Sequence, residues 1–238
     1  MGWFYVIFYQ PIYNLLVWFY DVIPGADMGL SIILVTVVIK GLTFPLTYKS
    51  LKSQKDLQEI QPKIEALKEK FKDDKESQAR ELMAVYKEHK VNPLASCLPL
   101  LIQLPIFIAL YQVLRDGIGS VKAEVLYPFI SSPGTVDAMF LGIIDLAKIS
   151  IPLALLAGAA QYFQAKEMIS QRAPSAVRKD PPAKDEDMLA AMNKSMLYFM
   201  PVMTIFIGTT SLPAGVMLYW FVTTVLTWLM YKMVLGKK

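Results

Sequence analysis

The chain has 238 residues, of which 55% are hydrophobic and 18% are charged, and its formal net charge is +4. Its mean hydropathy of +0.40 excludes an ordinary soluble domain, whose sequence carries more charge and fewer apolar residues. The charged residues gather in residues 49–90 and 166–194, and long apolar stretches separate these two blocks. This segregation is typical of a protein that crosses a bilayer several times and has two polar loops. Because acidic residues interleave with the basic ones in both blocks, we expect no specific nucleic-acid partner.

Residues 1–28 precede the first long apolar run and are rich in aromatic side chains. The first twenty residues contain no Lys or Arg and no small-residue cleavage site, so they do not resemble a secretory signal. Tyr and Trp favour the headgroup boundary, where an apolar ring and a polar tip are both satisfied. We therefore predict an interfacial amphipathic helix over Tyr5–Tyr20, followed by a turn, rather than an extra span. The lack of basic residues favours the outer face of the membrane.

The first apolar run, predicted to span the membrane over residues 29–50, contains Lys40 near its middle. An ammonium at bilayer depth costs roughly 2.5–3.5 kcal/mol on insertion scales, so such a residue usually faces protein or water. Thr36 lies four residues earlier and therefore on the same helix face, which indicates a wet groove. The alternative is that Lys40 snorkels to the cytoplasmic interface and the span ends early. However, Leu30 to Lys40 is only about 16 Å of helix, well short of a roughly 30 Å hydrocarbon core.

Four more apolar stretches follow, and they predict spans at residues 93–115, 146–166, 194–211 and 214–235. The last two are separated by only a few residues and so form an antiparallel hairpin. Lys49, Lys52 and Lys55 lie at the end of the first span and directly after it, whereas no Lys or Arg precedes it. The segment 116–145 carries more carboxylates than lysines and is expected outside. By the positive-inside rule we predict an all-α polytopic membrane protein with five transmembrane helices, N-terminus out and C-terminus in.

The two cytoplasmic segments, residues 51–92 and 167–193, differ in kind. In the first, apolar residues recur at a three-four spacing and others face back after a polar turn at residues 72–75. This pattern predicts an antiparallel helical hairpin, with a seam formed by Leu57, Ile60, Ile64, Leu67 and Phe71 on one side and Leu82, Met83, Val85 and Tyr86 on the other. Pro62 either kinks the first helix or begins a new one. The second segment is rich in Pro and mixed charge and is expected to be a flexible loop.

Several segments together resemble a known family in their order and spacing. They are residues 35–40 (VTVVIK), 57–64 (LQEIQPKI), 91–111 (VNPLASCLPLLIQLPIFIALY), 199–203 (FMPVM) and 212–220 (LPAGVMLYW). They resemble the YidC/Oxa1/Alb3 family of membrane protein insertases, and residues 91–111 resemble its third-span signature. The resemblance covers essentially the whole chain, and no single motif in it is catalytic. The chain resembles the shorter bacterial type, which lacks the additional N-terminal span and the large external domain.

The resemblance implies five helices around a hydrophilic groove that opens to the cytoplasm and the lipid and is closed on the outer side. Family members insert newly made membrane proteins, alone or beside the Sec translocon, and consume no nucleotide themselves. The resemblance assigns the groove cation to Lys40, the nearby hydroxyl to Thr36 and an amide to Gln103. It assigns an aromatic pair that contacts the passing substrate to Tyr219 and Trp220. The family's groove cation is usually Arg, and Lys differs because it can lose its proton when buried, although a wet groove keeps it charged.

The resemblance also implies that nascent membrane proteins and the lipid bilayer are the partners, and that the location is multi-pass in the bacterial plasma (inner) membrane. The Sec translocon, the ribosome and the signal recognition particle pathway are further candidate partners, and the chain is expected to act as a monomer. Two site assignments have ordinary structural alternatives. Gln103, between Pro99 and Pro105, could bond carbonyls that those prolines free, and Tyr219 and Trp220 could be packing residues.

Three other functions remain as alternatives: a small-solute transporter or channel that uses Lys40, an intramembrane enzyme, and a peripheral membrane chaperone. A transporter is often built from inverted repeats, and the sequence has no self-similar halves. No Ser–His, paired-Asp or His–Glu–His arrangement lies in the predicted spans, so we expect no enzyme. With one His and one Cys in the whole chain, we expect no metal, no cofactor and no intrachain disulfide, and Cys97 is expected to be a packed side chain.

Overall fold

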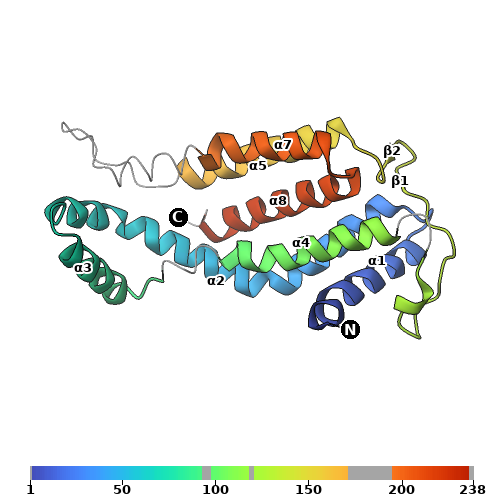
Figure 1. Cartoon of the computed structure of the whole chain (residues 1–238), viewed down its shortest axis with the longest axis horizontal. Helices are drawn as coiled ribbons and strands as arrows, with labels where there is room; N and C mark the ends of the chain where they lie inside the picture. The colour runs from blue at the N-terminus through green and yellow to red at the C-terminus, as the bar shows by residue number, and fades with distance from the viewer. Residues whose placement is uncertain (1, 93–97, 118–120, 171–194, 236–238) are drawn as a thin grey trace.

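A computed structural model describes residues 2–92, 98–117, 121–170 and 195–235 (Figure 1). The expectation of a mostly helical chain is confirmed, and the helices are η1 (Tyr5–Tyr9), α1 (Gln10–Val22), α2 (Met28–Lys70), α3 (Lys75–Glu88), α4 (Leu98–Gly117), α5 (Ile151–Ser170), η4 (Ser195–Phe199), α7 (Met200–Thr210) and α8 (Ala214–Leu235). Between α4 and α5 lie a short 3-10 turn, η3 (Ala123–Val125), and an antiparallel pair of strands, β1 (Met139–Phe140) and β2 (Ile144–Asp145). The sequence pattern did not predict this small sheet. Cys97 and most of the loop predicted at residues 167–193 lie outside the described residues.

The longest helix, α2, has 43 residues and runs without a break from the first predicted span into the cytoplasmic hairpin. Its first turn is capped by Asp27, whose carboxylate accepts a hydrogen bond from the Leu30 amide at 2.8 Å. The helix therefore does not end at the predicted boundary between residues 50 and 51. Residues 49–61 contain no Gly or Pro and consist mainly of residues that favour a helix, so nothing ends it there. Pro62 lies inside α2 and does not begin a new helix.

The cytoplasmic hairpin is formed by the end of α2 and by α3, which folds back along it (Figure 1). Ile60, Ile64 and Val91 are buried between the two helices, and Leu57, Leu82, Val85 and Tyr86 pack against them. One expected seam residue is misplaced, because Met83 is 55% exposed. The three-four pattern could not separate Met83 from Leu82, because adjacent residues on a short helix both lie near its apolar stripe.

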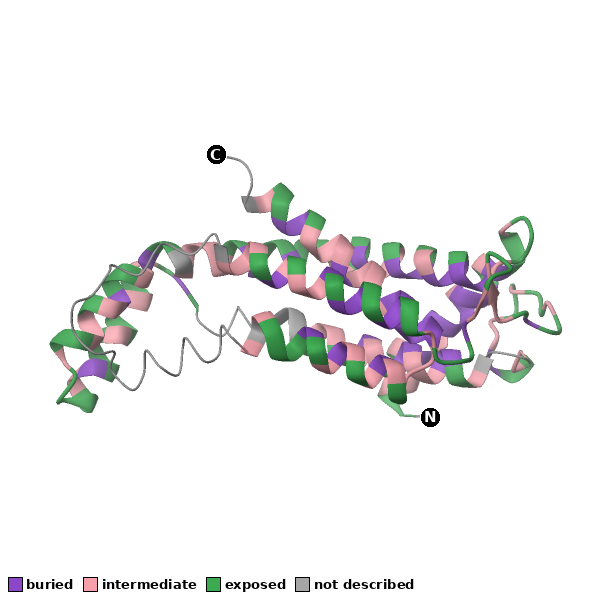
Figure 2. Ribbon diagram, turned by 90° about the horizontal axis from the view of Figure 1, so that it is seen from above, coloured by how far each residue is buried: buried purple, intermediate pink, exposed green. Residues whose placement is uncertain are grey.

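The remaining long helices lie side by side in a bundle (Figure 1). α8 packs between α2 and α5, and α5 packs against α7. The buried side chains gather at the end of the bundle where α2 and α8 begin and α4 finishes (Figure 2). The core there includes Tyr13, Ile32, Val35, Leu110, Val113, Leu114, Leu146, Ala154, Val216, Met217 and Tyr219. A much smaller cluster of Leu51, Met230 and Tyr231 lies further along α2 and α8.

The N-terminal helix α1 packs into this same end of the bundle. Asn14 is 1% exposed, and its side-chain amide donates to the Val125 carbonyl while its oxygen accepts from the Tyr127 amide. The hydroxyl groups of Tyr13 and Tyr20 accept backbone N–H groups of the same connecting loop. The loop between α4 and α5 is therefore held by polar groups of α1, and it needs little regular structure of its own.

Asp116, at the end of α4 and beyond the predicted span 93–115, is the centre of an ionic cluster. Its carboxylate accepts a hydrogen bond from Tyr9 at 3.2 Å and pairs with Lys122 at 3.2 Å and with Arg115 at 3.3 Å. Partial burial opposes ionisation, but the hydrogen bonds from Lys122 and Arg115 outweigh it and hold the pKa of Asp116 below its usual value.

The helix predicted for residues 146–166 begins later, at Ile151, and continues to Ser170. Leu146 cannot begin it, because its amide donates to the Ala138 carbonyl and its carbonyl accepts from the Gly215 amide. Pro152 then stands in the first turn, where its fixed φ favours a helix start. Within the described residues, the stretches Met28–Leu57 and Ala214–Val234 are long and apolar enough to cross a membrane, and Leu197–Thr210 is a shorter apolar helix.

Candidate functional site

One face of α2 is polar between the two apolar clusters. Ile32 and Val35 of the main core precede this polar face along the helix, and Leu51 of the smaller cluster follows it. The residues between them at a three-four spacing are Thr36, Lys40, Thr43, Thr47 and Ser50, which we call the polar stripe. Four of the five are buried and Thr43 is half-buried, so the stripe faces the protein along about 21 Å of helix. The sequence analysis found only its first two members.

The centre of the site is a chain of side-chain hydrogen bonds that joins three helices. The Lys40 ammonium, on α2 and 9% exposed, donates to the side-chain oxygen of Gln103 on α4 at 3.2 Å. The Gln103 amide in turn donates to the hydroxyl group of Tyr219 on α8, which is 1% exposed. The side-chain amide of Gln103 therefore bonds to other side chains at both its nitrogen and its oxygen. This arrangement differs from the alternative role considered for Gln103, in which its side chain bonds to backbone carbonyls that the nearby prolines leave free.

The ammonium of Lys40 is bonded to a neutral group. Of the carboxylates that the structure describes, none lies within ion-pairing distance of Lys40. A buried charge is usually paired, because removing it from water is expensive. Lys40 is thus held in position by Gln103 but keeps its attraction for a negative group that comes within reach.

The hydroxyl groups of the stripe are satisfied along their own helix. Thr36 donates to the Ile32 carbonyl at 2.6 Å, Thr43 to the Ile39 carbonyl at 2.9 Å, and Thr47 to the Thr43 carbonyl at 3.0 Å. A hydroxyl oxygen has two acceptor lone pairs, so each of these three oxygens keeps acceptor capacity. The stripe therefore combines one cation with threonine hydroxyl groups whose own donors are occupied.

The fifth expected residue, Trp220, lies beside the hydrogen-bonded chain and not in it. Its ring meets that of Phe107 on α4 edge to face, with centroids 5.4 Å apart. Tyr219 lies 6.5 Å from the same Phe107 ring, so the two neighbouring aromatic residues of α8 flank one residue of α4. The structure brings Lys40, Gln103 and Tyr219 together, while Thr36 lies one turn away and Trp220 packs against an apolar neighbour.

A second polar contact joins α5 and α7. The Thr204 hydroxyl, 4% exposed, donates to the side-chain oxygen of Gln161 at 2.5 Å. Sequence reasoning missed this pair, although Gln161, the first polar side chain in the apolar run that begins at residue 151, was a signal for it. The three-four spacing of hydroxyl residues after Lys40 was the corresponding signal for the rest of the polar stripe.

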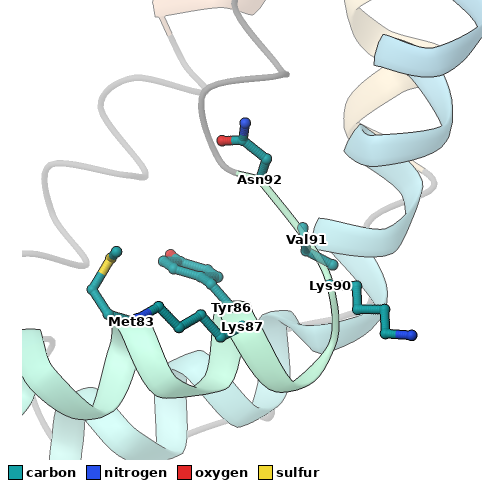
Figure 3. Close-up of a pocket in the computed structure, with 6 residues that line it drawn as sticks. All are labelled: Met83, Tyr86, Lys87, Lys90, Val91 and Asn92. Atoms are coloured by element: carbon teal, nitrogen blue, oxygen red, sulfur yellow. The ribbon is translucent and has the colours of Figure 1, made fainter.

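A hollow of about 290 Å³ lies away from the site, on the cytoplasmic hairpin (Figure 3). It is lined by Met83, Tyr86, Lys87, Lys90, Val91 and Asn92. Met83, Tyr86 and Lys87 lie along one wall, while the Lys90 side chain is directed away from them (Figure 3). The hollow contains no residue of the polar stripe. Within the described parts of the chain, no group of three or more His, Cys, Asp or Glu residues is placed to hold a metal ion.

Comparison with known proteins gives the family. The model of the family described as "60Kd inner membrane protein" matches residues 18–237. The chain belongs to the 60Kd inner membrane protein family. It is also 38% identical, over 227 residues, to the membrane protein insertase YidC of Pelobacter propionicus, an alignment that covers 95% of this chain. The corresponding YidC proteins of Rickettsia africae and Rickettsia akari are 36% and 35% identical over 224 and 220 residues, in both cases 92% of this chain.

These three relatives are longer proteins than this chain. The chain spans 38% of the length of the Pelobacter protein and 37% of that of each of the two Rickettsia proteins. The family resemblance recognised from the sequence motifs is confirmed. Membership of the 60Kd inner membrane protein family supports a location in a bacterial membrane. The names of the relatives describe insertion of proteins into membranes and not catalysis.

Proposed function

We propose that this chain is a membrane protein insertase, which moves short polar segments of nascent membrane proteins through a hydrated groove and releases their apolar segments into the lipid. The proposal extends the activity in the names of its relatives to this chain. The chain acts alone or beside the Sec translocon, with the nascent protein and the bilayer as partners. The ribosome and the signal recognition particle pathway are candidate sources of the nascent chain, and a monomer is sufficient for the activity.

The proposed topology has five spans, with the N-terminus outside and the cytoplasmic hairpin and C-terminus inside. The spans are residues 29–50, 93–115, 151–166, 194–211 and 214–235. The first lies within Met28–Leu57 and the fifth contains Ala214–Val234, the two stretches that are apolar and long enough by themselves. The well-packed end of the bundle then lies outside, because α2 and α8 begin there (Figure 2). The polar stripe begins where this packing ends, and it leads toward the cytoplasm. We therefore expect the proposed groove to be closed on the outer side.

The observation that carries the proposal is the buried ammonium of Lys40, which has a neutral partner in Gln103 and a row of hydroxyl oxygens along the same helix. A polar segment in the groove exchanges its hydration for these groups and has a shorter hydrocarbon path to cross. An acidic residue 4 Å from Lys40 gains about 4 kcal/mol at an effective dielectric constant near 20, before desolvation is subtracted. Burial of the arriving apolar helix in lipid, at roughly 25 cal/mol per Å², supplies the net driving force.

The test is insertion of a single-span substrate with an acidic tail into proteoliposomes that contain only this chain. We expect Lys40→Ala to lower the yield and Lys40→Glu to lower it further, because the second change repels the tail. If about a third of the Coulomb gain survives desolvation, the loss is about tenfold. Lys40→Arg is expected to retain activity, because the charge is kept.

The matched control is Lys49→Ala, which removes an exposed lysine of the same helix. Insertion by Lys40→Ala and Lys40→Glu at the level of the unchanged protein would refute a role for the charge. Passage of small solutes through proteoliposomes without any substrate would instead favour a transporter or channel. Crosslinks from residue 36 or residue 103 to the inserting chain separate passage through the groove from peripheral chaperoning.

A further inference from the structure

The turn between β1 and β2 has a composition that is unusual for a connection exposed to water. Residues 138–144 (AMFLGII) are uncharged and apolar, and the turn itself is Leu141, Gly142 and Ile143. Leu141 is 60% exposed and Ile143 is 79% exposed. Water-exposed turns are built mainly from Gly, Pro, Asn, Asp and Ser, as in the nearby segment 131–134 (SSPG). We call Leu141 and Ile143, with Gly142 between them, the apolar tip.

The apolar tip is held in a fixed place by polar and packing contacts. The Leu141 amide donates to the Asp27 carboxylate at 2.6 Å, and this same carboxylate caps α2. The neighbouring Phe140 turns inward and packs so closely on Gly29 that no Cβ atom fits between them. Leu141 adopts a φ of +51°, a left-handed conformation that is unfavourable for a residue other than Gly. Its side chain is 60% exposed and therefore gains little from packing against the protein.

The position of the apolar tip along the bundle follows from its base. The Leu146 amide donates to the Ala138 carbonyl, and the Leu146 carbonyl accepts from the amide of Gly215, in the first turn of α8. The base therefore lies level with the start of a helix that we assign as a span. Three residues separate the base from the tip, so the tip reaches at most about 10 Å from that level. The headgroup region on each side of the hydrocarbon core is roughly 5–8 Å thick, half of the difference between about 30 Å and about 40–45 Å, so a tip that does not point straight away from the core lies within it.

We propose that the apolar tip inserts into the outer leaflet of the bilayer, at the boundary between headgroups and acyl chains. Two more exposed apolar side chains follow a few residues later, Ile149 (48% exposed) and Ile151 (59% exposed), just before and at the start of α5. Because α5 is a helix that we assign as a span, this nearby apolar surface favours lipid as the occupant over a protein partner. The Lys148–Asp145 ion pair, 2.9 Å between its charged atoms, stands between the tip and α5 in the chain, and its charges suit the headgroup region. The tip then anchors the start of α2, through Asp27, to the membrane surface.

The test uses the whole chain, with Cys97→Ser as background and a nitroxide spin label at Ile143→Cys. The protein is reconstituted in vesicles of phosphatidylethanolamine and phosphatidylglycerol. Collision rates with oxygen, which concentrates in lipid, and with a water-soluble nickel chelate report the depth of the label. The matched control is a label at Thr135→Cys, which is also exposed and lies in the same connection between helices. We expect a ratio of oxygen to nickel collisions several-fold higher at residue 143 than at residue 135.

Equal ratios at the two positions would overturn the proposal, because the tip would then be in water. Dipolar broadening between labels at residue 143 of neighbouring chains would also overturn it, because a second copy would cover the tip. Neither measurement requires insertion activity, so a failure here is distinct from a failure of the proposed function.

Discussion

The hydrogen bond between Lys40 and Gln103 is the contact that most directly defines the site, and a double-mutant cycle measures it. The changes are Lys40→Met and Gln103→Leu, which remove the charge and the acceptor with little change in volume. Gln103→Leu alone leaves a buried ammonium without the acceptor that it has at 3.2 Å. A hydrogen bond to a charged group contributes about 1.5–3 kcal/mol, so we expect this variant to lose about 2 kcal/mol of stability.

Lys40→Met is expected to be neutral or to stabilise the fold, because it removes a charge that is only 9% exposed. In the double variant the loss caused by Gln103→Leu is expected to fall by about 1.5 kcal/mol, since the ammonium is no longer present. The bond from Gln103 to Tyr219 is lost with or without Lys40, and therefore cancels from the coupling energy.

The measurement is unfolding by sodium dodecyl sulfate in mixed micelles, followed by the circular dichroism of the helices. The control cycle pairs Gln103→Leu with Lys49→Met, because Lys49 is exposed on the same helix as Lys40. The stability changes of these two variants are expected to be additive. A coupling energy below about 0.5 kcal/mol for Lys40 and Gln103 would refute the reasoning, because that is the usual error of additivity between independent sites. It would mean that water replaces Gln103 as the partner of the ammonium.

Three further predictions concern the scaffold and are measured in the same micelles. Gly29→Ala is expected to destabilise the fold by about 1–3 kcal/mol, because the new Cβ atom would overlap the ring of Phe140. Gly41→Ala, which has open space around it, is expected to stabilise the fold by up to about 1 kcal/mol. Equal effects of the two changes would contradict the packing of Phe140 on Gly29. Asn14→Ala is expected to cost about 1–3 kcal/mol and to speed amide exchange at Tyr127, since it removes the acceptor of the Tyr127 amide, whereas the Val125 carbonyl still accepts from Gln10. Unchanged exchange would show that Asn14 does not hold the loop. The pKa of Asp116 is lowered in the fold, so the stability that its carboxylate contributes is complete above its unfolded pKa near 4 and is lost as the pH falls through the folded value. Asp116→Asn should therefore flatten the dependence of the free energy of unfolding on pH below about pH 4. An unchanged pH dependence would exclude this carboxylate as a cause of the loss of stability in acid.

The sequence alone determined the helical class and the family. Apolar runs and the segregation of charge follow directly from the requirement that a helix in lipid satisfies its own backbone and exposes apolar side chains. Lys40 stood out for the same reason, because a cation within an apolar run is exceptional whatever surrounds it. Thr36 followed from helical periodicity, and Gln103 and Tyr219 followed from the family motifs.

Only the tertiary structure decided which of these groups touch one another. The contact of Lys40 with Gln103 joins residues 63 positions apart, and that of Gln103 with Tyr219 joins residues 116 positions apart, so no local pattern encodes either. The exposure of Met83, beside Leu82 that packs inward, depended on packing that periodicity does not resolve. The short strands that hold the apolar tip form because Asp27 and the Gly29 backbone meet them from a distant part of the chain. Local sequence fixes helices through interactions over three or four residues, whereas polar contacts between helices depend on how the bundle closes.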